Sequence, residues 1–288
     1  MGFDQLASTA LTAIFSVSFL LIASVGLAVI FGMMGVINLA HGEFLMMGAY
    51  ATLMATKAGI PFPLAVVLAT LGLAVFGAIV EKAIIQFLYG RLFDTLLATW
   101  GLGMILYQSA ILVFGASTSG IGLPMGSFSL GRYSMPVYYL FLTAATVVIF
   151  AAVYLIFVKT RYGIMARAAI QNPSMAASVG IETKRINTIT FSLGAALAGL
   201  AGGLLVPAFP ATPDMGLAFV SKAFLAVVVA GPLTLTGTFA SMGGLGGLSS
   251  LTSSIYTSVA GDVAFFVVTI VILRFFPSGI SRGWRGKL

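Results

Sequence analysis

Residues 5–40, QLASTALTAIFSVSFLLIASVGLAVIFGMMGVINLA, contain no charged side chain. A helix needs about 20 apolar residues to cross the hydrocarbon core of a bilayer, so this run is long enough for one crossing with residues to spare. Further charge-free runs cover residues 58–80, 95–131, 133–158, 186–213 and 223–261. The uninterrupted apolar runs exclude a transmembrane β-barrel, whose strands alternate apolar and polar residues. The sequence therefore predicts an all-α, polytopic transmembrane helix bundle.

The composition indicates the same membrane environment. Of the 288 residues, 60% are hydrophobic and 7% are charged, whereas soluble domains carry about 25% charged residues. A chain this apolar lacks the polar surface that it would need in water, so the bilayer is its expected solvent. The net charge of +7 fits basic residues held on the cytoplasmic side, and we expect no nucleic acid partner.

The residue types that most enzymes and metal sites need are scarce. The sequence has no cysteine and one histidine, which excludes disulfides, thiol catalysis and Cys-ligated metal and argues against a zinc or haem site. It also has no phosphate-binding loop, no H-E-x-x-H motif and no G-x-S-x-G motif. We therefore expect a protein that is not an enzyme and binds no cofactor itself, so that any ATP and Mg would bind to partner subunits.

The basic residues set the predicted orientation, because the positive-inside rule assigns their clusters to the cytoplasm. The three clusters are Lys82 with Arg91; Lys159, Arg161, Arg167, Lys184 and Arg185; and Arg274, Arg282, Arg285 and Lys287. The loops around residues 57–62, 116–134 and 209–217 carry few charges and are expected outside. This parity predicts nine membrane segments, with the N-terminus outside and the C-terminus cytoplasmic. Eight segments, one of them partial, is the alternative.

Two features of the last quarter of the sequence affect the predicted number of membrane segments. The run 223–261 is too long for one crossing and is predicted to break near Gly231-Pro232 or within Gly243–Gly247. The apolar run between Asp262 and Arg274 has 11 residues, or about 17 Å of helix, which is too short to span the bilayer. Either the last helix begins before Asp262, which places the carboxylate at membrane depth, or the helix is tilted at a thin edge. We favour a position for Asp262 at the outer interface over one at membrane depth.

Small residues repeat every four positions in FSLGAALAGLAGGLLVP (191–207). Such repeats let apolar helices approach closely in a bilayer, where lipid provides no hydrophobic incentive for association. Close packing inside the bundle is the expected role, and a dedicated dimer face is the alternative. The residues concerned are Gly194, Ala198, Gly199, Gly202 and Gly203.

The longest polar stretch is residues 159–187, KTRYGIMARAAIQNPSMAASVGIETKRIN. It predicts two short helices, the first over Tyr162–Gln171. Asn172 can cap the second, with Pro173 at its first position and Gly180 ending it. Its alanines leave surfaces small enough for another protein's groove. The residues alone leave open whether the segment docks on a protein or lies on anionic lipid heads.

A second polar segment, GMMGVINLAHGEFLMMGAY (32–50), places Asn38, His41 and Glu43 within an otherwise uncharged region. Asn38 and His41 are three residues apart and share a helix face, whereas Glu43 is offset. Ionisable side chains at membrane depth are costly and usually functional. The alternative is a cap and turn at the cytoplasmic mouth, where water reaches these groups.

Three stretches resemble permease subunits of the branched-chain amino acid importers of the ATP-binding cassette class. They are GLAVIFGMMGVINLAHGEFLMMGAY (26–50), YGRLFDTLLATWGLGMILYQ (89–108) and GIMARAAIQNPSMAASVGIETKRINTITFSLGAALAGLAG (163–202). The second is closer to the urea and short-amide branch of that family than to the leucine branch. The resemblance implies one transmembrane permease domain over residues 1–288, in a bacterial inner membrane.

The resemblance also implies partners and residue roles. The partners are a sister permease, two cytoplasmic ATP-binding subunits, a periplasmic or extracellular solute-binding protein and membrane lipid. Residues 159–187 become a coupling loop that docks on the ATPase, with Arg167, Asn172, Ala176, Ala177, Gly180 and Ile181 as contacts. The translocation path is expected to involve Asn38, His41, Gly42 and Glu43.

Two other functional classes remain possible at this point. A stand-alone secondary transporter or channel would use ionisable relays near the membrane midplane, and the chain offers few of them. An intramembrane enzyme would need a catalytic pair at that depth. A path poor in charge suits a small neutral or zwitterionic solute, namely a branched-chain amino acid, urea or a short amide, and the sequence does not choose among them.

Overall fold

The computed structural model describes residues 3–116, 120–131, 133–231 and 234–281. Pro232 of the predicted break and Arg282, Arg285 and Lys287 of the predicted cytoplasmic tail lie outside these ranges.

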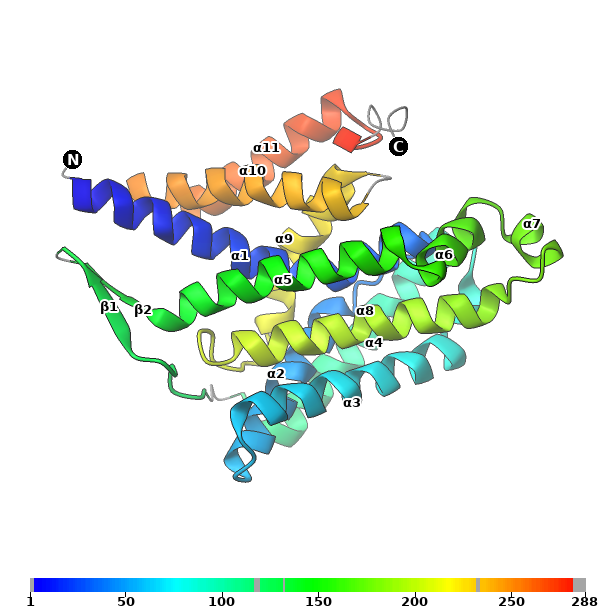
Figure 1. The fold of residues 1–288 in the computed structure, drawn as a ribbon, viewed down its shortest axis with the longest axis horizontal. Helices are drawn as coiled ribbons and strands as arrows, with labels where there is room; N and C mark the ends of the chain where they lie inside the picture. Colours follow the sequence, from blue (N-terminus) through cyan, green and yellow to red (C-terminus); the bar gives the residue numbers. More distant parts are fainter. Residues whose placement is uncertain (1–2, 117–119, 132, 232–233, 282–288) are drawn as a thin grey trace.

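Helices make up most of the described chain (Figure 1). The long ones are α1 (Phe3–Met34), α2 (His41–Lys57), α3 (Phe62–Ala83), α4 (Leu92–Phe114), α5 (Val137–Lys159), α8 (Thr183–Leu205), α9 (Met215–Ala230), α10 (Thr234–Ile255) and α11 (Ser258–Phe275). The short ones are the 3-10 helix η1 (Ile85–Leu88), α6 (Arg161–Gln171) and α7 (Pro173–Ser178).

Within the described ranges, six helices are long and apolar enough to cross a membrane: α1, α3, α4, α5, α8 and α11. The pair α9 and α10, bent by 119° at their break, adds a seventh if it forms one broken span. The polytopic helix bundle is therefore confirmed, whereas the predicted eight or nine segments are not. The difference arises because α2 and α9 have 17 and 16 residues, fewer than a full crossing needs.

The first of the two expected break points in the run 223–261 is the one that the structure shows. Helix α9 ends at Ala230, and Gly231 follows with φ +77°. A positive φ is readily adopted only by glycine, so this residue can end the helix where another would strain the backbone. The alternative break, Gly243–Gly247, lies inside the continuous helix α10.

Helix α8 is the packing centre of the bundle, with its most extensive contacts to α3 and α2. A Cβ atom placed on Gly202 would lie 1.9 Å from the carbonyl oxygen of Leu45 in α2. One placed on Gly199 would lie 2.8 Å from Cβ of Leu73 in α3. The absence of side chains at these positions is therefore what allows the helix backbones to approach so closely.

The other small residues of α8 face the same bundle. A Cβ on Gly194 would lie 2.3 Å from Cγ1 of Ile30 in α1, and one on Gly203 would lie 2.6 Å from Oγ1 of Thr52 in α2. Ala198 is fully buried. These contacts all lie within one chain, which is the intrabundle packing favoured above over a dimer face.

One element departs from the all-α prediction. Residues 116–134 are expected to form an irregular external loop, but an antiparallel hairpin joins β1 (Ser127–Leu130) to β2 (Tyr133–Pro136). A two-stranded hairpin of four-residue strands has little apolar periodicity to distinguish it from a loop. The hairpin and the start of α1 lie at one end of the molecule, and α6 and α7 lie at the other (Figure 1).

Asp262 lies in the first half of α11, which begins four residues earlier at Ser258. Its Oδ1 atom accepts a 2.6 Å hydrogen bond from Nζ of Lys222 in α9, and the two groups form an ion pair. Of the two explanations for the short run after Asp262, an earlier helix start is therefore correct. Half of the Asp262 side chain is exposed, and its position relative to the membrane stays a prediction.

Candidate functional site

The polar residues at the start of α2 lie beside the middle of α1. Nε2 of His41 is 3.1 Å from the carbonyl oxygen of Ala23, which precedes Met34, the last residue of α1, by 11 residues. That separation corresponds to about 16 Å along a helix. After α1 the chain therefore turns back along this helix, and α2 begins beside its middle.

Glycines allow this turn and the close packing around it. Gly35 follows α1 with φ +65°, a conformation that favours glycine. A Cβ on Gly26 would lie 2.7 Å from Cε1 of the His41 ring, and one on Gly42 would lie 2.2 Å from the carbonyl oxygen of Gly216 in α9. Helices α1 and α9 can therefore enclose the first turn of α2 only with glycine at these positions.

The three predicted polar residues come together here, almost completely buried: Asn38 is 0% exposed, His41 1% and Glu43 8%. Oδ1 of Asn38 accepts a 3.1 Å hydrogen bond from the backbone N–H of Ala40. The backbone N–H of Leu39 donates to Oγ1 of Thr99 in α4 at 3.1 Å. Side chains thus occupy two N–H groups before the helix, but the N-cap residue is Ala40 and no side chain caps the first turn of α2.

Each of these three side chains also keeps one buried atom without a hydrogen-bond partner: Nδ2 of Asn38, Nδ1 of His41 and Oε2 of Glu43. A carbonyl oxygen only accepts, so Nε2 of His41 donates to Ala23 and Nδ1 of the neutral ring is left as an acceptor. Buried polar atoms are nearly always paired. Three unpaired atoms at one helix start therefore mark this region as one that another molecule can complete.

Glu43 lies between α4 and α9. A Cβ on Gly103 of α4 would lie 3.6 Å from its Cγ atom, and one on Gly216 of α9 would lie 2.9 Å from Oε2. The ion pairs found within the described ranges are Arg91 with Asp94 and Lys222 with Asp262. Glu43 belongs to neither, so its carboxyl group has glycine backbone rather than a basic side chain beside it.

The predicted coupling segment folds into the two short helices expected from the sequence. Oγ1 of Thr160 accepts from the backbone N–H of Gly163 at 3.2 Å and caps α6. Oδ1 of Asn172 accepts from the backbone N–H of Met175 at 3.0 Å and caps α7. Gly180 follows α7 with φ +88°. The local sequence therefore determines the shape of this segment.

Several of the predicted contact residues instead hold the segment to the bundle. Nη1 of Arg167 donates to the carbonyl oxygen of Phe157 at the end of α5. Ala176 is 3% exposed, and Ile181 packs against a buried apolar cluster. Ala176 was assigned as a contact through the family resemblance, and its burial leaves little of its side chain for a partner to touch.

The large exposed apolar side chains of this segment were not among the predicted contacts: Met175 is 62% exposed, Val179 69% and Ile164 58%. Of the predicted contacts, Ala177 is exposed. A polar, basic segment that presents large apolar side chains is typical of a surface that another molecule covers. Large apolar side chains close to basic residues in the sequence were the signal that could have identified these positions.

A buried hydrogen-bond network connects α8, the helix that follows the coupling segment, to α3. Glu81, 1% exposed near the end of α3, accepts at Oε1 from the Tyr89 hydroxyl and at Oε2 from Oγ1 of Thr188 in α8 at 2.6 Å. Nearby, the Tyr162 hydroxyl of α6 is 2.7 Å from Oγ1 of Thr190 in α8. Glu81 directly follows the charge-free run 58–80, and no role was predicted for it. These hydrogen bonds connect α6, α8 and α3 rigidly.

Thr188→Val is expected to destabilise the protein, because it leaves one buried oxygen of Glu81 without a donor. A hydrogen bond to a charged group contributes about 1.5–3 kcal/mol, so the midpoint of thermal unfolding in detergent should fall by several degrees. Thr143→Val is the matched control, since the Thr143 hydroxyl bonds only to the carbonyl oxygen of Tyr139 in its own helix. Equal midpoints for the two variants would contradict a structural role for the Glu81 network.

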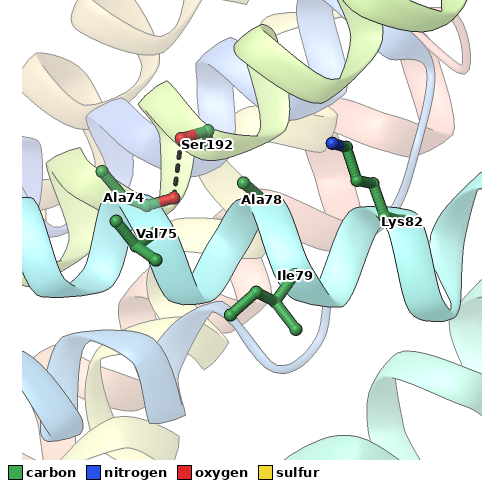
Figure 2. Close-up of a pocket in the computed structure, with 6 residues that line it drawn as sticks. All are labelled: Ala74, Val75, Ala78, Ile79, Lys82 and Ser192. Atoms are coloured by element: carbon green, nitrogen blue, oxygen red, sulfur yellow. Dashed lines mark hydrogen bonds between the residues drawn. The ribbon is translucent and has the colours of Figure 1, made fainter.

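A shallow groove of about 270 Å³ runs along the outer surface of α3 and α8. Figure 2 shows its lining, in which Oγ of Ser192 donates to the carbonyl oxygen of Ala74 at 2.7 Å and Lys82 lies at one end. Val75 and Ile79 are 62% and 58% exposed. The groove is open and apolar and faces away from the bundle, so it suits an acyl chain of a lipid better than a polar solute in transit.

Metal-binding groups do not gather in the described ranges: no three His, Cys, Asp or Glu side chains lie close enough there to hold an ion.

Comparisons with known proteins all indicate the same family. Residues 9–276 match the family model described as the permease component of branched-chain amino acid transport systems. The chain is 30% identical over 284 residues to the high-affinity branched-chain amino acid transport system permease protein LivH of Escherichia coli (strain K12). It is 29% identical over 277 residues to the corresponding permease protein BraD of Pseudomonas aeruginosa. Each alignment covers 89% of this chain and 89% of the relative. No solved structure matches the chain.

Proposed function

The chain belongs to the family of permease components of branched-chain amino acid transport systems, and on that basis we propose that it is the membrane-spanning subunit of an ATP-binding cassette importer in a bacterial inner membrane. It moves a small neutral or zwitterionic solute inward, and ATP hydrolysis on separate subunits drives the movement. ATP and Mg bind to those subunits. The permease itself provides the path and the docking surface.

The observation that carries this proposal is the α6–α7 segment. It projects at the end of the molecule opposite the N-terminus (Figure 1), it is rich in basic residues, and it exposes Met175 and Val179. Basic residues favour the cytoplasmic side, where an ATPase would bind. Hydrogen bonds then connect α6 and α8 to α3 through Thr190 and Glu81. Docking at α7 can therefore move membrane helices rather than only a loop.

The proposed topology is the one with nine membrane segments, the N-terminus outside and the C-terminus cytoplasmic. Among the described residues, nine α-helices have 16 residues or more. Helices α2 and α9, too short to cross alone, count as partial segments with their starts packed against each other at Gly42 and Gly216. Short broken helices that meet inside the bundle are typical of transporter binding sites.

The importer has four kinds of partner in this proposal. They are a sister permease, two cytoplasmic ATP-binding subunits, a solute-binding protein outside the membrane and surrounding lipid. The exposed apolar faces of α3 and α4 have room for lipid and for the sister subunit. Either can cover side chains such as Leu71, Ile79, Trp100 and Leu112, all more than half exposed.

A stand-alone secondary transporter is the second candidate, and one observation favours it. Glu43 is buried in the bundle and belongs to neither ion pair of the described residues, and ion-coupled carriers use such groups as relays. Purified chain alone would then move solute into liposomes along an ion gradient and without ATP.

The test of the importer proposal is purification of the tagged chain from its native cells in mild detergent, with mass spectrometry of the proteins that accompany it. We expect a second permease and two ATPases, and ATP-dependent uptake of leucine or urea after reconstitution. Recovery of a monodisperse chain without partners, with ATP-independent uptake, would contradict the importer function and favour the secondary transporter.

A further inference from the structure

Glu43 is a buried acidic residue without a counter-charge in the described part of the chain, and, unlike Glu81, it keeps one carboxyl oxygen without a hydrogen-bond partner. The Glu43 residue is 8% exposed, its Oε2 atom has no hydrogen-bond partner, and neither ion pair of the described ranges includes it. Removing one partner of a buried charge pair costs about 3–5 kcal/mol. A carboxylate kept in this position without a partner is therefore suited to pair with a charged group that comes and goes.

Glycine backbone encloses Glu43 so closely that a Cβ atom on Gly216 would lie 2.9 Å from its Oε2 atom, so a group that pairs with the carboxylate reaches it only when α2 and α9 separate. The Glu43 carboxyl group lies against Gly103 of α4 and Gly216 of α9, the smallest residues available. It belongs to the first turn of α2, which starts beside the middle of α1. The carboxylate therefore lies within the bundle rather than at one of its ends.

The same face of α2 continues outward from Glu43. Tyr50 is seven residues later, two helical turns along the same face and about 10 Å away. Its ring stacks on Phe114 of α4 at a centroid distance of 4.3 Å, but its buried hydroxyl has no partner. The unpaired Tyr50 hydroxyl and the unpaired Glu43 oxygen are therefore two buried polar atoms on α2 that a polar solute could satisfy.

We propose that Glu43 is the transient counter-ion for the ammonium group of a zwitterionic amino acid, with Tyr50 as a second contact on the same face. The unpaired amide Nδ2 of Asn38, close in sequence to Glu43 and equally buried, is a donor that suits the carboxylate of the same solute. This inference rests on the importer function proposed above, and among its solutes it selects the amino acid over urea or a short amide. A neutral solute has no charge that would offset the cost of a buried carboxylate.

The test uses the complete complex, purified with its partner subunits and reconstituted in proteoliposomes, with radiolabelled leucine and urea as probes. Glu43→Gln keeps the shape of the side chain and removes its charge. Charge-assisted contacts contribute about 1.5–3 kcal/mol, so ATP-driven leucine uptake should fall about 10- to 100-fold while the subunit composition stays unchanged. Asp94→Asn, at an exposed carboxylate on α4, should leave uptake unchanged.

Two further variants separate a charge effect from a structural one. Glu43→Asp keeps the charge and should retain at least a third of the leucine uptake. Tyr50→Phe removes a hydroxyl that has no partner, so it should fold normally and lower leucine uptake several-fold. This second variant decides the question if the Glu43→Gln complex does not assemble.

The outcomes distinguish this inference from the function on which it rests. Leucine uptake within twofold of the unmodified complex for Glu43→Gln, equal losses for Glu43→Gln and Glu43→Asp, or uptake of urea without leucine would each overturn the counter-ion role and leave an ATP-driven importer. A neutral, protonated Glu43 corresponds to the first of these outcomes. Failure of the unmodified complex to take up either solute with ATP would instead overturn the importer function.

Discussion

Replacing Met175 with glutamate is expected to reduce ATP-driven uptake to below a tenth of the normal rate and to release the ATPases during purification. Met175 lies on α7 and is 62% exposed. If an ATPase groove encloses this side chain, the new carboxylate is buried there without a partner. An unpaired buried charge costs about 3–5 kcal/mol, which corresponds to a loss in affinity of more than about a hundredfold. Co-purification and uptake measure the two effects separately.

The controls for this variant come from the same segment. Met175→Leu keeps an apolar side chain of similar size and should retain both docking and uptake. Gln171→Glu places the same charge on an exposed position at the end of α6 and should have little effect. Ala176 is unsuited to the test, since it is buried and a charge there would disturb α7 itself. Normal co-purification of the ATPases with the Met175→Glu chain would show that α7 is not the docking surface.

The sequence predicted the regular parts of the fold because charge and apolar length alone determine them. The runs 58–80, 133–158 and 186–213 each contain most of one observed span. The run 5–40 showed the limit of this reasoning. Its last residues, 35–40, are uncharged like the helix before them, yet they turn back into the bundle so that His41 reaches Ala23. Only tertiary packing, through glycines such as Gly26, determines that turn.

The candidate site was predictable where a polar residue stands out in an apolar segment. Asn38, His41 and Glu43 satisfied that condition, and the structure gathers them at one helix start. Tyr50 and Glu81 did not satisfy it. A tyrosine is common in apolar helices, and Glu81 directly precedes Lys82, so it looked like the boundary of a span. Their importance depends on hydrogen bonds made or missing in the folded state, which residue spacing does not determine.

The largest expected effect on stability is that of Gly202→Ala. A Cβ atom at this position would lie 1.9 Å from the carbonyl oxygen of Leu45, 2.9 Å from its carbonyl carbon and 2.8 Å from the backbone nitrogen of Ala49. These atoms are all backbone, so no side chain can rotate away and α2 must separate from α8. Overpacking of this kind costs about 1–3 kcal/mol, and more where the backbone has to shift. The start of α2, with Glu43, would be displaced at the same time.

We expect the thermal unfolding midpoint of purified Gly202→Ala protein to fall by roughly 5–10 °C, because 1 kcal/mol corresponds to about 2–4 °C in a chain of this size class. Gly72→Ala is the matched control on the neighbouring helix α3. Its Cβ atom would meet no atom within 4 Å, and alanine is the better helix former, so its midpoint should stay the same or rise slightly. If both substitutions lower the midpoint equally, the close approach of α2 and α8 does not limit stability, and helix flexibility at glycine does.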